Sequence, residues 1–163
     1  MFEIILFVVL FAIDQLVKYW SVNALAYIPE GISLFGNYLR LDYAENWANN
    51  VSFIRGRSSF MNVVRILQLV VVIYLLVKHK HKMAKVTRIG LVLFLAGLIG
   101  NQFNYFTMGY VPDMFILWLM PNIVFNVADI YVFIAMIILF IRLAFFEGQD
   151  LINWIIDKTG KKT

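Results

Sequence analysis

The sequence of 163 residues contains no cysteine, three prolines and only ten acidic side chains. The absence of cysteine excludes disulfide bonds and thiolate metal sites, and it leaves the redox compartment undetermined. Histidine is also scarce: His79 and His81 both lie in a basic stretch, which is the ordinary setting of a solvated loop and gives no reason to expect a metal. Because acidic residues are so few, each can be considered individually.

Apolar residues, in contrast, make up 62% of the chain. A soluble domain would be roughly half apolar, and the excess here gathers into runs of about the 20 residues that cross a bilayer. The first run carries charges and lacks a basic leader, which argues against a cleaved signal peptide. We therefore expect an all-α membrane protein with four transmembrane helices and a single integral-membrane domain, 1–163. The predicted spans are 2–20, 61–77, 89–108 and 126–146.

The net charge of +4 is concentrated beside two of these spans. Lysine and arginine crowd the connection 78–88 and the region from Arg142 to the end of the chain. Positive residues near short loops mark the cytoplasmic side, so both termini are expected inside and residues 21–60 and 109–125 outside. This placement at membrane edges gives no reason to expect a nucleic-acid partner.

The first outer segment has the pattern of a strand. In "YLRLDYA" apolar and polar residues alternate with a period of two, which predicts a small extracytoplasmic β-sheet within 27–56. The second outer segment, 113–125, is too apolar for a loop, and we expect it to lie along the membrane interface with Trp118 as an anchor. Asn126 then caps the fourth helix. The tail 147–163 is compatible with an interfacial helix or with a frayed end.

Three carboxylates lie in or beside apolar runs, and two of them fall at the same depth on the outer side. Asp113 directly precedes the interfacial segment, and Asp129 is one turn into the fourth helix. Two carboxylates at close range cannot both ionise easily, so one can act as an acid and the other as a base. This arrangement could activate water against a peptide carbonyl, and a proton or cation relay would use the same residues.

The third carboxylate, Asp14, lies four residues before Lys18 and therefore on the same face of the first helix. The pair is either self-neutralising near the end of the span or part of the polar cavity that holds the other two aspartates. Asn101 and Asn104 place two amides on one face of the third helix, where helix packing is the ordinary interpretation.

Together these stretches resemble the bacterial lipoprotein signal peptidase (signal peptidase II) family, in order and through nearly the whole chain. "DQLVK" at 14–18 resembles the family's D-Q-x-x-K, and "AGLIGN" at 96–101 resembles its glycine-rich approach to an asparagine. "LDYAENWANNVSF" at 41–53 resembles the N-x-G-A-x-F region, "GYVPDMF" the G-x-V-x-D-F segment, and "FNVAD" the F-N-x-A-D motif.

The resemblance implies an intramembrane aspartyl peptidase with Asp113 and Asp129 as its catalytic pair. It implies a substrate that is a prolipoprotein with a diacylglyceryl-modified cysteine, cut just before that cysteine, at the outer face of the bacterial inner membrane. Membrane lipid is the other expected partner, no metal or cofactor is implied, and a monomer would suffice. The substrate-binding residues it implies are Asn46, Asn101, Asn126, Asp14, Lys18 and Tyr105.

The sequence departs from the family pattern around the expected pocket. The family's G-N-x-x-D-R reads "GNQFNY", so Asn104 replaces an aspartate and Tyr105 replaces an arginine. A tyrosine keeps a hydroxyl donor but lacks the fixed charge and planar fork of arginine. Two alternatives stay open: a relative that binds lipidated precursors without cutting them, and a small transporter that uses the three aspartates as a relay.

Overall fold

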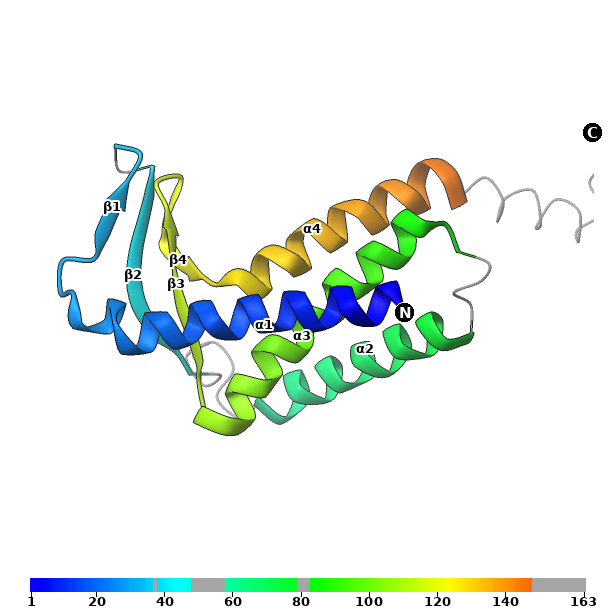
Figure 1. Ribbon diagram of the computed structural model, residues 1–163, viewed down its shortest axis with the longest axis horizontal. Coiled ribbons are helices and arrows are strands. Elements are labelled where there is room, and N and C mark those ends of the chain that lie inside the picture. Colours follow the sequence, from blue (N-terminus) through cyan, green and yellow to red (C-terminus); the bar gives the residue numbers. More distant parts are fainter. Residues whose placement is uncertain (37, 48–57, 79–82, 148–163) are drawn as a thin grey trace, which may run out of the picture.

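The computed structural model describes residues 1–36, 38–47, 58–78 and 83–147. The chain forms four long helices and a four-stranded sheet, which stands at one end of the helices (Figure 1). The helices are α1 Phe2–Asn23, α2 Ser58–Lys78, α3 Lys85–Met108 and α4 Val127–Arg142, with a 3-10 turn at Leu25–Tyr27 and a π-helical turn at Leu143–Glu147. The strands are β1 Ile32–Leu34, β2 Leu39–Asn46, β3 Val111–Leu117 and β4 Met120–Phe125.

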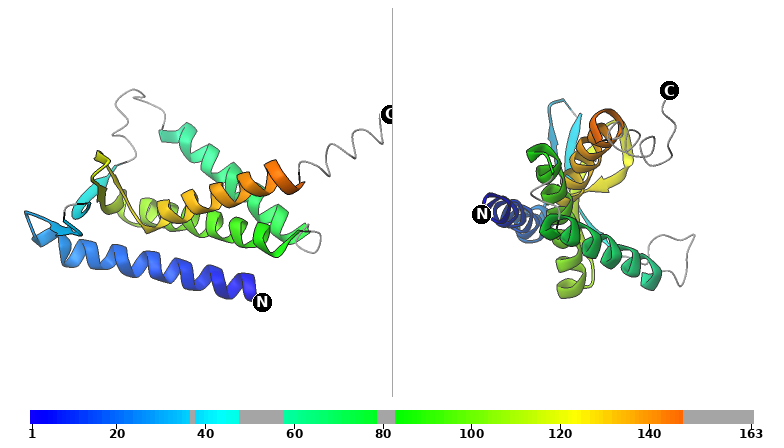
Figure 2. Two further views of the ribbon diagram at one scale, coloured as in Figure 1. Left: turned by 90° about the horizontal axis from the view of Figure 1, so that it is seen from above. Right: turned by 90° about the vertical axis from the view of Figure 1, so that its right-hand side faces the viewer.

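The helix α3 is the centre of the helical part, with α1, α2 and α4 packed around it (Figure 2). Glycines on α3 allow this close packing: a Cβ atom at Gly97 would lie 2.5 Å from the carbonyl oxygen of Ala128 in α4. At the end away from the sheet, the Nε atom of Arg88 in α3 lies 3.0 Å from a carboxylate oxygen of Glu3 in α1. At the same end, Arg142 donates a hydrogen bond of 3.2 Å to Thr87.

Large apolar side chains face outward along the helices. Phe133, Ile137 and Phe140 of α4 are all exposed, as suits a helix whose surroundings are lipid. Among the residues that the structure describes, two helices are long and apolar enough to cross a bilayer, namely α3 and the helix from Val127 to Phe145. The predicted spans 2–20, 61–77, 89–108 and 126–146 each coincide with a helix that begins and ends within about five residues of the prediction.

The sheet is antiparallel with strand order β1-β2-β3-β4, so it combines both outer segments. The prediction of strands within 27–56 is confirmed for β1 and β2, whereas residues 48–57 lie outside the described part. Residues 113–125, which are expected to lie along the membrane interface, fall within the β3–β4 hairpin, a strand pairing that the sequence did not predict. Trp118 lies at the turn of this hairpin, where its ring packs edge-on against Tyr38 at 5.9 Å between ring centroids.

The hairpin leads directly into α4, whose start is fixed by local chemistry. The side chain of Asn126 accepts a hydrogen bond from the backbone N–H of Asp129, and the Asp129 carboxylate accepts one from the backbone N–H of Asn126. This reciprocal capping box provides acceptors for two backbone N–H groups that have no hydrogen-bond partner within the helix. The prediction of Asn126 as the N-cap is therefore confirmed. The tail 148–163 and both histidines lie outside the described residues.

Candidate active site

The first carboxylate of the site, Asp113, lies in the middle of the sheet and is only 2% exposed. The pairing of β2 with β3 brings Asn46 to this strand from the other outer segment. Its Nδ2 atom donates a hydrogen bond of 2.9 Å to Oδ2 of Asp113. The other oxygen, Oδ1, accepts a short hydrogen bond from Nδ2 of Asn126. Two amides from different elements thus fix the orientation of this carboxylate.

The second carboxylate, Asp129, lies in the first turn of α4. Its Oδ2 atom accepts from the backbone of Asn126 at 3.1 Å, and its Oδ1 atom accepts from Nδ2 of Asn101 at 2.8 Å. The N-terminal end of a helix dipole favours a negative charge at this position. The capping box and Asn101 together hold the carboxylate against α3.

Asn126 contacts both carboxylates, Asp113 through its side chain and Asp129 through its backbone N–H. Burial raises the pKa of Asp113 to about 6, and the negative charge of Asp129 acts in the same direction, while the hydrogen bonds from Asn126 and Asn46 oppose the rise. One carboxyl group of the pair therefore keeps its proton up to about pH 6, well above the pH at which an ordinary aspartate loses it. This asymmetry is what acid–base chemistry at a single bond requires.

A buried ion pair on α1 is connected to the second carboxylate through Asn101 and through the first turn of α4. The Nζ atom of Lys18 donates to Oδ2 of Asp14 at 2.9 Å and to Oδ1 of Asn101 at 2.8 Å. The other oxygen of Asp14 accepts from the backbone N–H of Ala128 at 3.0 Å. Asp14 and Lys18 are essentially unexposed. The pair therefore connects α1 to Asn101 on α3 and to the N-terminus of α4.

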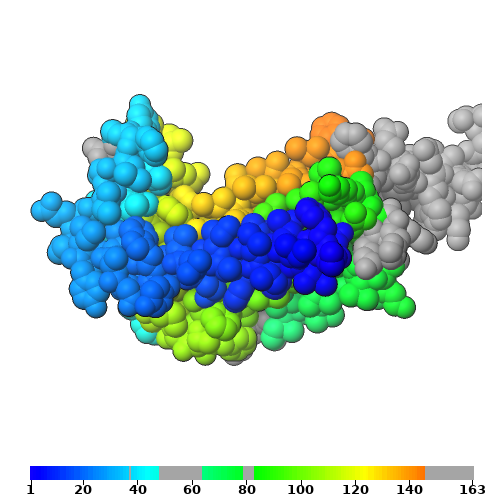
Figure 3. All heavy atoms as spheres, viewed as in Figure 1, coloured from blue at the N-terminus to red at the C-terminus, as the bar shows by residue number. Residues whose placement is uncertain are grey.

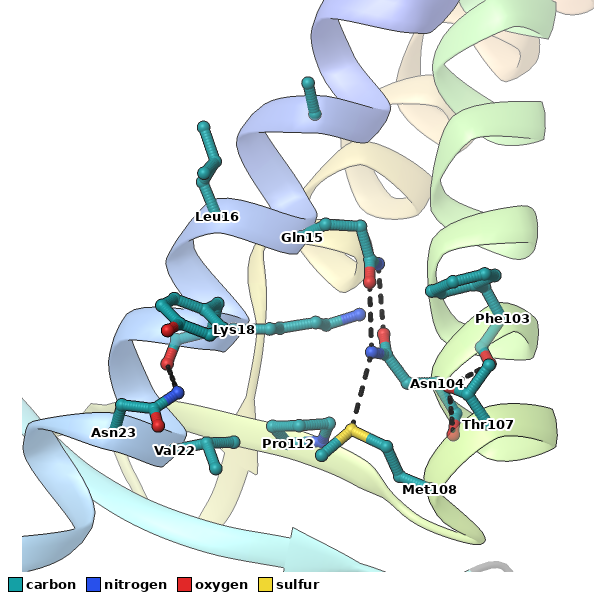
Figure 4. A pocket seen from close by; sticks show the side chains of 12 residues that line it. Gln15, Leu16, Lys18, Val22, Asn23, Phe103, Asn104, Thr107, Met108 and Pro112 are labelled. Atoms are coloured by element: carbon teal, nitrogen blue, oxygen red, sulfur yellow. Dashed lines mark hydrogen bonds between the residues drawn. The ribbon is translucent and has the colours of Figure 1, made fainter.

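One turn further along α3, a pair of amides joins the same helices. Gln15 and Asn104 exchange two hydrogen bonds of 3.1 Å, one in each direction (Figure 4). Gln15 also donates to Oδ2 of Asp14 at 2.9 Å. These residues border a mostly apolar groove of about 710 Å³ between α1 and α3, which Lys18, Phe103 and Met108 also line. Asn104, which departs from the family pattern, thus has a packing role between two helices.

A second, smaller and more polar pocket of about 90 Å³ lies against the second carboxylate. It receives residues from α2, α3, α4 and both central strands. Its lining consists of Asn46, Arg65, Asn101, Tyr105, Val111, Asn126 and Asp129.

The structure brings the predicted site residues together at the junction of the sheet and the helices. Asn46, Asn101 and Asn126 each donate to a carboxylate of the pair, and Tyr105 lines the small pocket. Sequence reasoning missed Arg65 as part of the site. The signal was present, because an arginine inside an apolar span is unusual enough to suggest a function.

Residues 6–145 match the family described as signal peptidase (SPase) II. A lipoprotein signal peptidase of Enterococcus faecalis (strain ATCC 700802 / V583) is 34% identical over 82% of this chain and 82% of its own length. A lipoprotein signal peptidase of Clostridioides difficile (strain 630) is 29% identical over 92% of this chain and 99% of its own.

Among solved structures, one described as a bacterial membrane enzyme, determined by the in meso method at 1.9 Å resolution, has a TM-score of 0.78 with this chain. It is 21% identical, and the alignment covers 88% of this chain and 93% of that structure. A second bacterial membrane enzyme, at 2.3 Å resolution, has a TM-score of 0.70 and is 19% identical, over 98% of this chain and 91% of its own. These likenesses show a shared fold.

Proposed function

The chain belongs to the signal peptidase II family, whose members are membrane peptidases, and on that basis we propose that it is an aspartyl endopeptidase that matures lipoproteins. Its substrate in this proposal is a prolipoprotein whose cysteine carries diacylglyceryl. The enzyme cuts the peptide bond just before that cysteine and releases the signal peptide.

The observation that carries this proposal is the pair of carboxylates joined through Asn126. In the proposed reaction Asp129 accepts a proton from a water molecule, whose oxygen then bonds to the carbonyl carbon of the scissile peptide. Asp113, with its raised pKa, holds the proton that passes to the departing amine nitrogen as the C–N bond breaks. No other reactant is needed.

The remaining residues of the site hold this pair in place. Asn46 holds Asp113 and Asn101 holds Asp129 through one hydrogen bond each, in addition to any contact with substrate. Asp14 and Lys18 act on the site indirectly. Both are buried; Lys18 donates to Asn101, and Asp14 accepts from the backbone N–H of Ala128 in α4. Removing such buried supports costs activity through the geometry of the acids that they orient.

The proposed placement has all four helices crossing the inner membrane, with both termini in the cytoplasm and the sheet outside. The carboxylates then lie at the outer interface, where a lipid-bearing cysteine would be held by its acyl chains. The exposed apolar side chains of α4 suit lipid contact. A monomer contains every residue of the proposed site, and membrane lipid is the expected partner besides the substrate.

The test is cleavage of a diacylglyceryl-modified prolipoprotein by the purified protein in lipid, with Asp113→Asn and Asp129→Asn beside it. Asp42→Asn is the matched control, because Asp42 lies in the same sheet but pairs with Arg40 at a surface position. We expect the wild type and Asp42→Asn to cut, and the other two variants to lose at least about 1,000-fold in kcat.

Binding of the precursor without cleavage, across several precursors, would identify a lipoprotein-binding relative instead. Cleavage that survives either substitution at the pair would show that the two aspartates are not the catalytic groups.

A further inference from the structure

The reaction proposed above makes no use of the apolar groove between α1 and α3 (Figure 4). Leu16 and Val22 line it from α1, Phe103 and Met108 line it from α3, and Pro112 of β3 lies at the end nearest the sheet. None of the described residues that line this groove also lines the small pocket beside the carboxylates. The groove is therefore a second cavity, and its occupant has to be inferred from its own surface.

The polar side chains at the bottom of the groove are paired within the protein. Gln15 and Asn104 exchange two hydrogen bonds of 3.1 Å. Lys18 is the only charged residue of the described lining, and its buried ammonium group donates to Asp14 at 2.9 Å and to Asn101 at 2.8 Å. An occupant of the groove therefore meets apolar surface and paired polar groups, with no free charge among the described lining residues.

The length of the groove corresponds to one leaflet of a bilayer. Along α1 its lining extends from Ala12 to Asn23, which is about 16 Å at a rise of 1.5 Å per residue. The hydrocarbon core of a bilayer is about 30 Å thick, so that each leaflet contributes about 15 Å. A chain that runs beside α1 within the groove therefore crosses one leaflet.

The polarity of the groove changes along this length. Asn23 and Thr107 lie close to the ends of their helices, next to the sheet, whereas Ala12 and Leu16 line the opposite end. A phospholipid has the same order, with ester and head groups above a hydrocarbon chain. Leu16 is 67% exposed and Phe103 is also exposed, so the rim of the groove continues the outward-facing apolar surface of the helices.

We propose that this groove binds one acyl chain of a phospholipid of the outer leaflet. The chain lies between Leu16 and Phe103, and the ester groups of the lipid lie beside Asn23 and Thr107. Because the surrounding lipid is as apolar as the groove, affinity comes from close packing and from the polar end rather than from the hydrophobic effect. The inference rests on the proposed placement in the membrane, and it does not depend on the proposed chemistry.

A chain bound in this groove has a measurable effect on the protein. It contacts both α1 and α3 beside the buried pair of Asp14 and Lys18, and Asp14 in turn holds the start of α4. A ligand that binds only the folded protein raises its stability as the site fills. The lipid should therefore raise the unfolding midpoint, and the amount retained should reach one molecule per protein.

The experiment uses the full-length protein, stripped of lipid in a mild detergent and titrated with dioleoyl phosphatidylglycerol. Native mass spectrometry counts the retained lipid molecules, and thermal unfolding gives the midpoint. Ala12→Trp places an indole in the groove, at a position where the native side chain is exposed. Ile13→Trp is the matched control, because Ile13 is the next residue of α1, is 44% exposed and is not part of the described lining.

We expect the wild type and Ile13→Trp to retain one lipid and to gain stability with increasing lipid concentration. Ala12→Trp should lose at least about tenfold in affinity, because the indole and the chain compete for the same space. Phosphatidylcholine with the same chains should bind as well as phosphatidylglycerol, because the described lining has no free charge for a head group.

A last arm separates a membrane phospholipid from the acyl chains of a substrate. The diacylglyceryl-modified precursor is added to Asp113→Asn loaded with phosphatidylglycerol, so that the precursor stays whole if the proposed chemistry is correct. We expect the phospholipid to remain bound, since the groove and the pocket beside the carboxylates have separate linings among the described residues.

Four results would overturn the inference. They are equal lipid retention by Ala12→Trp and the wild type, an equal loss in Ile13→Trp, a difference of more than about tenfold in affinity between the two head groups, and displacement of the phospholipid by the precursor. Should Ala12→Trp fail to fold, Val22→Trp decides by the same criterion, since Val22 also lines the groove. The lipid count of the wild type and the two tryptophan variants needs no cleavage, so a failure of the proposed function, seen as a wild type that does not cut, is distinguishable from a failure of this inference.

Discussion

Asn126 shows how much of this site depends on single polar side chains. Its side-chain oxygen caps α4, its side-chain nitrogen bonds to one carboxylate, and its backbone nitrogen bonds to the other. An amide is suited to this because it donates and accepts at once and carries no charge between two acids. An aspartate here could cap the helix as well, but it would place a third carboxylate against the pair.

The raised pKa of Asp113 has a consequence for stability. The folded protein holds the proton of the Asp113 carboxyl group more tightly than the unfolded chain does. Asp113 therefore contributes stability that is fully present below pH 3.8 and is lost as the pH rises through about 6. A shift of this size corresponds to about 3 kcal/mol at most. We expect Asp113→Asn to be more stable than the wild type at pH 7 and closer to it at pH 4.

Thermal unfolding midpoints of both proteins in detergent, measured between pH 4 and pH 8, test this. The difference between the two curves isolates the contribution of Asp113, since the other titrating groups are common to both. If the midpoints of the wild type and Asp113→Asn change in parallel with pH, the predicted contribution of Asp113 is contradicted. The same substitution should abolish cleavage, so a gain in stability would accompany a loss of function.

The buried pair of Asp14 and Lys18 leads to a second prediction at this scale. Removal of one partner leaves an uncompensated buried charge, which typically costs about 3–5 kcal/mol, whereas replacing both by apolar residues costs much less. We expect Lys18→Met and Asp14→Leu to be strongly destabilised and the double variant to recover most of the loss. Unfolding in detergent measures all four proteins of this cycle, and additive losses would show that the two charges do not depend on each other.

At the scale of elements, the contact between α3 and α4 determines where the second carboxylate lies. The two helices touch at Gly97, which is opposite the backbone of Ala128, immediately before Asp129. The start of α4 can therefore move only if α3 moves too. The sheet holds the other carboxylate independently, so the distance between the acids depends on how these two elements meet.

Gly97→Ala tests this contact. The new methyl carbon would lie 2.5 Å from the Ala128 carbonyl oxygen, and overpacking of this kind typically costs about 1–3 kcal/mol. We expect a clear loss of kcat, because the start of α4 must shift, and a lowered unfolding midpoint. Gly90→Ala is the control: the atoms nearest to its methyl carbon would be side-chain atoms of Ile138 and Leu139, at 3.0 to 3.3 Å. Equal effects of the two substitutions on kcat would argue against the role of Gly97.

At the scale of the whole molecule, the protein is polarised along its length. At one end of the molecule the sheet stands to one side of α1 (Figure 3), and the site lies where the sheet and the helices meet. At the opposite end, Glu3 with Arg88 and Thr87 with Arg142 form polar contacts. The exposed side chains between the two ends are largely apolar. This is the distribution expected for a protein whose middle is surrounded by lipid.

The absence of native cysteine makes the proposed orientation easy to test. Leu119, at the β3–β4 turn, is 76% exposed, and Lys85 begins α3 at the other end. In intact spheroplasts, we expect Leu119→Cys to react with a membrane-impermeant thiol reagent and Lys85→Cys to react only after the membrane is opened. The reverse pattern would place the sheet in the cytoplasm and contradict the proposed orientation.

Hydrophobic runs and capping chemistry were sufficient to predict the four helices and the N-cap at Asn126, whereas the grouping of the asparagines with the two aspartates came from the family resemblance. Hydrophobic run lengths and capping chemistry are local, so they can be read along the chain. The β3–β4 hairpin was missed because "MFILWLMPNIVF" is apolar at nearly every position and lacks the alternation that indicates a strand. Its first strand, β3, pairs with β2, more than 60 residues earlier, and β4 pairs in turn with β3. No local pattern reports the pairing with β2.

Two polar contacts were missed for a related reason. Gln15 was recognised only as part of a motif. Asn104 was expected to take part in helix packing, but its partner was not predicted: the two amides bond to each other across α1 and α3. Arg65 joins the pocket from a helix on which no site residue was expected. Spacing along the chain cannot show which faces of separate helices meet.

The hydrogen bond between Asp14 and the backbone of Ala128 joins α1 with α4, which is synthesised more than 100 residues later. Asn46 and Asp113, 67 residues apart in the chain, must also meet before the first carboxylate is held. A nascent chain that lacks α4 has neither Asp129 nor the residue that positions both acids. If the chain has the proposed function, we therefore expect its catalytic site to form only after α4 has been synthesised and inserted, so that incomplete chains cannot cleave lipoproteins.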